Sequence, residues 1–183
     1  MYYPVIGLEI HVQSNAKTKM FSRTPSDYFH KGANEYIDPV SFGLPGALPV
    51  PNKTAFEKCL RLALALNCKI NQKTKFDRKH YFYPDLPKGY QISQYDKPIG
   101  YDGYVEKEIG DDAKRIRLER IHLEEDTGKL LHQLPGASKK DEEYTYVDFN
   151  RSSVPLLELV TEPVIHDSET AVRFAKEYQR VLR

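Results

Sequence analysis

The sequence has little of several features that would place it quickly in a class of proteins. It has no tryptophan and only two cysteines, Cys59 and Cys68, among 183 residues. Two cysteines are too few for a disulfide framework, so we expect reduced thiols and a cytoplasmic protein. No apolar run approaches the length of a membrane span, and the N-terminus lacks the pattern of a signal peptide. We therefore expect no membrane association.

The chain also lacks a strong net charge and the common nucleotide-binding motifs. Its formal net charge is +1, so any contact with nucleic acid has to come from a local basic patch. It contains no GxxxxGK[ST] loop, no GxGxxG, no HExxH and no CxxC motif. A nucleotide that binds this chain is therefore not held by a P-loop.

The length and composition are those of a single globular domain. A chain of 183 residues is long enough to bury a core. Hydrophobic residues make up 40% and charged residues 29%, which is ordinary for such a domain. Short alternating segments are more frequent than helical ones, so the sequence predicts an α+β fold with a mainly antiparallel sheet and flanking helices.

Two segments have the helical period. The first runs from Asn52, a suitable N-cap, to Asn67, a suitable stop. Its core-facing residues are predicted to be Phe56, Leu60, Ala63 and Leu64. The second helix is predicted to be capped by Ser168, with Ala171, Phe174, Ala175, Tyr178 and Leu182 on its apolar side. Both helices are expected to be structural.

A long hairpin is predicted in the middle of the chain. Residues 104–109 and 114–125 form its arms, joined through Gly110-Asp111-Asp112. The Tyr101-Asp102-Gly103 segment is expected to be a turn before it, and residues 134–143 a loop after it. The second arm alternates imperfectly. Ile116, Leu118, His122 and Glu124 share one face, and Ile121, Leu123 and Glu125 share the other, so the pattern leaves the buried face open.

Residues 5–13 alternate well enough for a strand. Its even-numbered residues form an apolar face, which places Glu9 and His11 side by side on the other face. A carboxylate and an imidazole at this spacing can bind a divalent metal, or act as a base and its orienting partner. A solvated strand face explains the same pair.

The segment His122-Leu123-Glu124-Glu125-Asp126 is a second acidic cluster. Three consecutive acids repel one another unless they are solvated or bridged by a cation. A magnesium site needs only one or two protein carboxylates, so this cluster is a candidate for one if Glu9 and His11 lie nearby. Downstream, Arg151 follows a short strand, where it can clamp a phosphate or pair with an acid. Residues 154–160 form an apolar strand interrupted at Glu158.

The stretch from Lys75 to Gln94 combines basic and aromatic side chains. It has four Lys or Arg, five aromatics and two acids. Cations can bind phosphates, and aromatic faces can stack on bases. Pro84, Pro87 and Gly89 predict a fixed loop between two extended pieces. An aromatic core strand with a solvated basic flank fits this composition equally well.

Several long blocks resemble one known family in the same order along the chain. They are VIGLEIHVQ (5–13), GLPGALPVPN (43–52), FDRKHYFYPDLPKGYQISQ (76–94), RIHLEEDTGKL (120–130) and VDFNRSSVPLLELVTEP (147–163). These blocks resemble the B subunit of the aspartyl/glutamyl-tRNA amidotransferase family. The resemblance implies a cradle domain similar to glutamine synthetase, with residues 1–183 as the N-terminal part of that domain.

The resemblance also implies an activity. The family's B subunit uses ATP and Mg²⁺ to phosphorylate the side-chain carboxylate of Glu-tRNA(Gln) or Asp-tRNA(Asn). Ammonia from the amidase (the A subunit) then displaces the phosphate, and the small C subunit completes the complex. Phosphorylation turns a carboxylate oxygen into a good leaving group, so the protein mainly positions and neutralises anions.

The implied site residues follow from matching positions. Glu9, His11, Glu124 and Glu125 match the acids and the histidine implied to hold Mg²⁺. Arg151 matches the arginine of a D-x-N-R segment and is implied to be catalytic. The loop implied to contact ATP or the acylated tRNA end supplies Lys79, Tyr81, Tyr83, Lys88 and Gln91.

The chain departs from the family pattern in two ways. Many members carry a four-cysteine zinc site, whereas the matching stretches here contain Ser22 and Ser41 and no cysteine. We therefore expect no structural zinc. The family's full-length protein is also much longer, so we expect this chain to be a truncated form. The alternatives are the archaeal-type E subunit specific for Glu-tRNA and an inert RNA-binding or assembly module.

Overall fold

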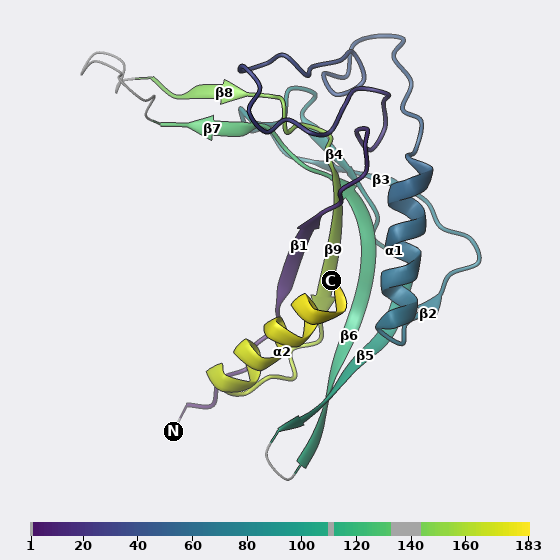
Figure 1. The fold of residues 1–183 in the computed structure, drawn as a ribbon, viewed down its shortest axis with the longest axis vertical. Helices are drawn as coiled ribbons and strands as arrows, with labels where there is room; N and C mark the ends of the chain where they lie inside the picture. The colour runs from purple at the N-terminus through teal and green to yellow at the C-terminus, as the bar shows by residue number, and fades with distance from the viewer. Residues whose placement is uncertain (1, 110–111, 133–143) are drawn as a thin grey trace.

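The main structural element is a five-stranded antiparallel sheet. The computed structural model in Figure 1 describes residues 2–109, 112–132 and 144–183. The strand order is β1 (Glu9–Gln13), β9 (Pro155–Thr161), β6 (Asp112–Glu125), β5 (Gly100–Ile109) and β2 (Lys69–Ile70). Strands β3 (Asp77–His80) and β4 (Tyr90–Ser93) form one small antiparallel sheet, and β7 (Lys129–Leu131) and β8 (Tyr146–Asp148) form another. With helices α1 (Lys53–Ala65) and α2 (Ser168–Val181), the arrangement confirms a mixed fold with antiparallel sheets.

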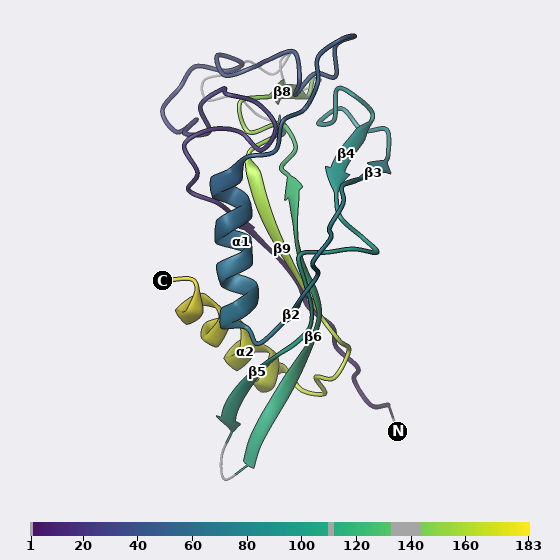
Figure 2. The same cartoon turned by 90° about the vertical axis from the view of Figure 1, so that its right-hand side faces the viewer.

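Both helices lie on the same face of the main sheet, and the β3–β4 hairpin lies on the other (Figure 2). The hydrophobic core fills the space between the sheet and the helices. Its buried members include Ile121, Leu123, Leu157 and Leu159 from the sheet, Cys59 and Ala63 from α1, and Phe174 and Tyr178 from α2. The opposite face of the sheet is therefore free to carry polar groups.

Helix α1 begins and ends where the sequence predicts. The side chain of Asn52 accepts a hydrogen bond from the Ala55 amide at 3.0 Å, which caps the helix. Asn67 has a φ of 55°, so the chain leaves the helix in the left-handed region that asparagine tolerates. The predicted core residue Leu64 is wrong, because it is 58% exposed. Ala63 is buried as predicted, together with Ala55, Cys59 and Leu62, and Phe56 and Leu60 are partly buried against the core.

Helix α1 approaches the sheet closely at Ala63. The side chain of Ala63 lies against the backbone of the sheet, where a Cβ added to Gly100 would be 2.7 Å from the Ala63 Cβ. Such a close approach admits only a small side chain at this point of the helix.

Helix α2 is capped by Asp167 and not by the predicted Ser168. The Asp167 carboxylate accepts a hydrogen bond from the Thr170 amide at 2.7 Å. Phe174 and Tyr178 are buried as predicted, whereas Leu182 is 38% exposed. The helices within the described residues are α1 and α2, and neither is long and apolar enough to cross a membrane.

The predicted hairpin is confirmed as β5 and β6, which pair from Gly100 opposite Ile121 to Ile109 opposite Asp112. The turn predicted at Tyr101-Asp102-Gly103 is wrong, because β5 already includes these residues. Asp102 has a φ of 51°, which explains the turn-like signal within a continuous strand. The connecting residues Gly110 and Asp111, and the loop expected at residues 134–143, lie outside the described residues.

A register shift in β6 explains its imperfect alternation. The pairing with β9 shifts between Leu118 and Arg120, so one residue is added to this strand. Ile116 and Leu118 before the shift, and Ile121 and Leu123 after it, are all buried. The added residue reverses which alternate residues of β6 face the helices, so all four of these side chains can point toward them. Neither face drawn from the sequence is therefore correct along the whole strand.

The basic and aromatic stretch forms the predicted pair of extended pieces. β3 and β4 pair from Asp77 opposite Ser93 to His80 opposite Tyr90. The amide of Tyr81 donates to the carbonyl of Gly89 at 3.2 Å, which closes the loop between them. Gly89 has a φ of 72°, a conformation that glycine adopts without strain. The hairpin therefore stands as a defined unit over the open face of the main sheet.

Candidate metal centre

The open face of the main sheet gathers residues from three strands. β1, β9 and β6 are neighbours, and their register aligns residues that alternate toward the same side. The aligned rows are Glu9, Val160 and Arg120; His11, Glu158 and His122; and Gln13, Leu156 and Glu124. Strands far apart in the chain thus place three carboxylates and two imidazoles on one surface.

The imidazole of His11 is at the centre of this cluster. Its Nε2 lies 3.2 Å from Glu124 Oε1 and 3.3 Å from Glu158 Oε2. Glu9 Oε1 is 3.6 Å away from the same nitrogen. The structure therefore brings together three of the residues that the sequence analysis selected as metal ligands: Glu9, His11 and Glu124.

Two members of the cluster were missed by the sequence analysis. Glu158 is buried and contacts both histidines of the cluster. His122 is 1% exposed, and its Nε2 lies 3.3 Å from Glu158 Oε2. The available signal was the single acid in the apolar segment PLLELVT of β9. A charged residue within a central strand is unusual unless it has a partner or a ligand.

Burial and mutual contacts set the charges of the two buried residues. Burial opposes ionisation of Glu158, but its hydrogen bond and attraction to His122, with contributions from Glu124 and His11, leave its pKa below the ordinary value. Burial likewise opposes protonation of His122, and the hydrogen bonds to Glu124 and Glu158 leave its pKa raised. The two groups therefore favour the imidazolium–carboxylate form.

The cluster has the composition of a site for a hard cation. Glu9, His11 and Glu158 form one group whose ligand atoms lie within 4.8 Å of one another, and His122, Glu124 and Glu158 form a second. Among the described residues, no lysine or arginine forms an ion pair with these three carboxylates. Three carboxylates with only histidine as counter-charge fit a divalent ion that prefers oxygen ligands. The donor set therefore fits Mg²⁺.

Glu125 lies apart from this cluster. Its Oε1 is 2.6 Å from Lys88 Nζ and accepts a hydrogen bond from the Ile92 amide at 2.8 Å. Its Oε2 accepts a hydrogen bond from Ser153 Oγ at 2.7 Å. Because successive residues of a strand point in opposite directions, Glu124 and Glu125 enter different environments. The carboxylate of Glu125 joins β6 to the β3–β4 hairpin.

The candidate ligand-binding residues of the hairpin fall into two groups. Lys88 and Gln91 are used within the protein, since Lys88 pairs with Glu125 and Gln91 Nε2 donates to the Glu125 carbonyl at 2.7 Å. Tyr83 is 56% exposed on the connecting loop, and Lys79 is exposed on β3. Burial, and then the charges of Asp85, Glu124, Asp126 and Glu125, raise the pKa of Tyr81 to about 12.

Arg151 is held by the turn that follows β6. Its Nε donates to the Thr127 carbonyl at 2.9 Å, and its Nη2 donates to the Gly128 carbonyl at 2.8 Å. Asp126 Oδ1 lies 3.5 Å from the same Nε. The sequence suggested that Arg151 either clamps a phosphate or pairs with an acid, and in this structure it pairs with an acid.

The stretches that match the family's zinc-binding segments are joined by a carboxylate. Asp38 Oδ2 accepts hydrogen bonds from Ser41 Oγ at 2.7 Å and Ser22 Oγ at 3.1 Å. Buried Lys19 has its Nζ 3.8 Å from the same oxygen. Both cysteines, Cys59 and Cys68, are buried elsewhere as free thiols. Zinc requires thiolate or imidazole ligands of a kind that these serines do not supply, so the residues present do not fit it.

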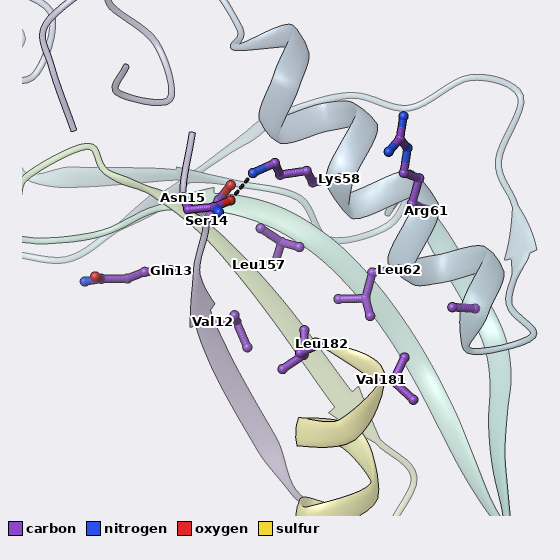
Figure 3. A pocket seen from close by; sticks show the side chains of 11 residues that line it. Val12, Gln13, Ser14, Asn15, Lys58, Arg61, Leu62, Leu157, Val181 and Leu182 are labelled. Carbon is purple, nitrogen blue, oxygen red and sulfur yellow. Dashed lines mark hydrogen bonds between the residues drawn. The ribbon is translucent and has the colours of Figure 1, made fainter. Parts of the chain in front are cut away.

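The helix side of the sheet contains a cavity of a different kind (Figure 3). It has a volume of about 580 Å³ and lies between α1, the end of α2 and β1. Its floor is apolar, with Val12, Leu62, Leu157 and Val181, and its titratable lining residues are Lys58 and Arg61. Without a carboxylate or histidine it has no metal-binding chemistry. The acid cluster on the opposite face remains the candidate centre.

Comparison with known proteins agrees with the sequence blocks. A family model described as the GatB/GatE catalytic domain matches residues 4–183. The chain is 53% identical over 182 residues to the B subunit of aspartyl/glutamyl-tRNA(Asn/Gln) amidotransferase of Thermosipho melanesiensis, covering 100% of this chain and 37% of that protein. The protein of the same name from Corynebacterium jeikeium is 52% identical over 183 residues, covering 98% of this chain and 36% of that protein.

The extent of these matches establishes the family of this chain, but the matches cover only part of each relative's length. The chain spans 37% of the length of the Thermosipho relative, so most of that protein has no counterpart here. The family model nevertheless covers nearly every residue of this chain, including all members of the acid cluster. The chain therefore belongs to the GatB/GatE catalytic domain family.

Proposed function

We propose that this chain is the ATP-dependent catalytic part of a tRNA-dependent amidotransferase. In this reaction the side-chain carboxylate of Glu-tRNA(Gln) or Asp-tRNA(Asn) is phosphorylated, and ammonia derived from glutamine replaces the phosphate. The observation that carries the proposal is the convergence of Glu9, His11, Glu124 and Glu158 on one face of the sheet. The relatives named as amidotransferase B subunits support the substrate class.

In this proposal the acid cluster holds Mg²⁺. Glu9, His11, Glu124 and Glu158 would supply the ligands, and His122 would hold Glu158 in position through its 3.3 Å contact. When bound, the metal neutralises phosphate charge and orients the phosphoryl group. Glu125 would support the site from outside, because its contacts with Lys88 and Ile92 hold the hairpin against β6.

The remaining candidate residues act on the anionic substrates. Lys79 and Tyr83 are accessible on the hairpin and would contact ATP or the acylated end of the tRNA. Tyr81 would stay protonated as a hydrogen-bond donor, given its raised pKa. Lys88, Gln91 and Arg151 would position these groups through their internal bonds.

The proposal also specifies the setting of the reaction. Residues 1–183 would form part of a glutamine-synthetase-like cradle domain. Its partners would be the amidase (the A subunit), the small C subunit and the mischarged tRNA, in a cytoplasmic complex. The two domain types of the family differ in substrate, and the relatives named as B subunits favour the B type over the archaeal E type.

The test uses the full-length protein in its complex. Calorimetric titration with MnCl₂, and then with Mg²⁺-ATP, is compared between the wild type and a Glu9→Gln/Glu158→Gln variant. We expect metal binding to weaken at least about 100-fold in the variant, because two of four ligands are lost. ATP-dependent formation of Gln-tRNA(Gln) or Asn-tRNA(Asn) should be lost in parallel.

A Glu106→Gln variant is the matched control, since Glu106 is an exposed acid on β5 that pairs with Arg115. It should bind metal like the wild type. Metal binding that persists in the double variant would refute the assignment of the site. A complex that binds mischarged tRNA but neither metal nor ATP would instead support the inert RNA-binding alternative.

A further inference from the structure

A second cavity, which is polar, lies directly beside the acid cluster. It has a volume of about 310 Å³ and is enclosed by the β3–β4 hairpin on one side and by β6 and β9 on the other. Asp77 and Lys79 line it from β3, Arg120 and His122 from β6, and Glu158 from β9. It therefore shares His122 and Glu158 with the cluster and reaches the place where chemistry is proposed.

Three of the side chains around this cavity have unsatisfied polar atoms. Asp77 Oδ2, Arg120 Nε and His122 Nδ1 are buried and have no hydrogen-bond partner among the described residues. Each of the first two side chains also has a partnered atom, since Asp77 Oδ1 pairs with Lys75 at 2.9 Å and Arg120 Nη1 with Glu119 at 2.5 Å. Unsatisfied buried polar atoms are uncommon, and three around one cavity indicate a polar ligand.

The charges around the cavity define what kind of ligand fits. Arg78, Lys79 and Arg120 offer positive charge, which suits a carboxylate or a phosphate. Asp77 and Glu158 offer negative charge at the same cavity, which opposes a polyphosphate and suits an ammonium group. A volume of about 310 Å³ is at the lower end for ligand sites, enough for an amino-acid group and small for a whole nucleotide.

We propose that this cavity binds the aminoacyl group of the substrate, with its α-ammonium at Asp77 and its side-chain carboxylate at Arg120. The inference rests on the proposed function, whose substrate it locates. An aminoacyl ester on tRNA has a free ammonium and a free side-chain carboxylate, and its α-carboxyl group is neutral. Those are the two charges that Asp77 and Arg120 complement. Arg120 is two residues before His122 on the same face of β6, so the carboxylate would lie next to the metal cluster.

The neighbouring residues support this orientation. The guanidinium of Arg120 lies 5.4 Å from the ring centre of Tyr95, which restricts its movement on one side. Lys75 pairs with both Asp77 and Asp96, at 2.9 and 3.0 Å, and so holds the Asp77 carboxylate on the hairpin. Asp77 and Arg120 are therefore positioned before a ligand arrives.

The test measures binding of three small esters to the full-length protein in its complex, with Mg²⁺ and a non-hydrolysable ATP analogue present. L-glutamate α-methyl ester carries both charges of the aminoacyl group. N-acetyl-L-glutamate α-methyl ester lacks the ammonium, and L-glutamine α-methyl ester lacks the side-chain carboxylate. We expect the first to bind at least about tenfold more tightly than either of the others, because each lost charge removes one charge-assisted hydrogen bond.

Two variants assign the charges to residues. In Asp77→Asn the preference over the N-acetyl ester should disappear, while the preference over the glutamine ester remains. In Arg120→Gln the reverse should hold. Asp96→Asn and Arg117→Gln are matched controls, because Asp96 shares Lys75 and Arg117 is on β6, but neither lines the cavity. Both controls should keep the wild-type preferences.

The outcomes separate this inference from the proposed function. Equal binding of the three esters, no binding of any, or preferences unchanged in both variants would overturn the aminoacyl subsite. Loss of metal binding in the Glu9/Glu158 variant would still support the kinase proposal in that case. Conversely, the expected ester preferences in a complex that does not use ATP would support the subsite and refute the kinase.

Discussion

Glu124 and Glu125 are adjacent in the sequence and buried to the same degree, yet their surroundings are opposite. Glu124 accepts one hydrogen bond from Ser93 Oγ at 3.1 Å, and the charged groups that it faces are His11, His122 and Glu158, with no lysine or arginine paired to it among the described residues. Glu125 has a lysine at 2.6 Å, a backbone amide at 2.8 Å and a serine hydroxyl at 2.7 Å. One carboxylate lies in an uncompensated cluster and the other in a neutralised network.

This contrast indicates that partners, and not residue type, separate a chemical role from an architectural one. A buried acid with a full set of donors stabilises the fold or its specificity. Buried acids whose only positively charged neighbours are histidines are stabilised when a cation binds. Asp38 follows the Glu125 pattern, since its carboxylate is bonded to Ser22 and Ser41 and paired with Lys19.

The largest expected effect is the loss of activity on substitution of Glu124. We expect Glu124→Gln to reduce ATP-dependent tRNA amidation by the full-length complex about 100-fold or more, because a metal ligand is lost. The free energy of unfolding should change much less than the activity, since the glutamine has the same shape and can still accept the hydrogen bond from Ser93, and the lost attraction to the histidines is offset by less repulsion among the acids. Activity assays and urea unfolding measure the two quantities. A variant that is as active as the wild type would remove Glu124 from the site.

The next effect is on stability at Glu125. We expect Glu125→Gln to lower the free energy of unfolding by about 3 kcal/mol, because Lys88 is left as a buried cation without its partner. Urea unfolding of the full-length protein measures this loss. The double variant Glu125→Gln/Lys88→Met should recover part of it. If the single variant unfolds at the wild-type urea concentration, the ion pair does not hold the hairpin.

A smaller effect should appear in the pH dependence of Lys19. Burial lowers the pKa of Lys19 to about 8, against the attraction of Asp38 and Glu125. The unfolded state therefore keeps this proton up to its ordinary value near 10.5, whereas the folded state releases it near 8. Because the unfolded state binds more protons in this window, the Lys19 contribution to stability rises with pH from about 8 to about 10.5.

We therefore expect the stability of the wild type relative to Lys19→Met to increase by on the order of 2 kcal/mol between about pH 7.5 and about pH 10. Urea unfolding of both proteins at the two pH values measures the change, and tyrosine ionisation cancels in the difference. The same difference at both pH values would mean that the lysine titrates normally in the folded protein.

The smallest effect is expected for a pair in solvent. Lys69 and Asp102 form an ion pair in which both side chains are exposed to solvent. We expect Lys69→Ala to leave the urea midpoint unchanged, because solvent screens the pair and both side chains lose freedom by forming it. A marked loss of stability would show that an exposed ion pair also stabilises the fold. It would weaken the contrast between Glu124 and Glu125.

Local sequence was sufficient to specify several elements and the first half of the site. Asn52 and Asn67 mark the ends of α1, and Pro84, Pro87 and Gly89 mark the loop of the β3–β4 hairpin, because these residues act through their own backbone and near neighbours. Alternation in residues 5–13 was enough to place Glu9 and His11 on one face. The run of acids at residues 124–126 added Glu124 as a candidate, and the family resemblance implied the same residue.

Which acids belong together depends instead on how distant strands pair. The register of β1 with β9, and of β9 with β6, places His11, Glu158 and His122 in one row. The shift between Leu118 and Arg120 determines which residues of β6 face that row, and so decides that Glu124 and not Glu125 joins it. Register and bulges arise from pairing between strands that are far apart in the chain, so no local pattern specifies them.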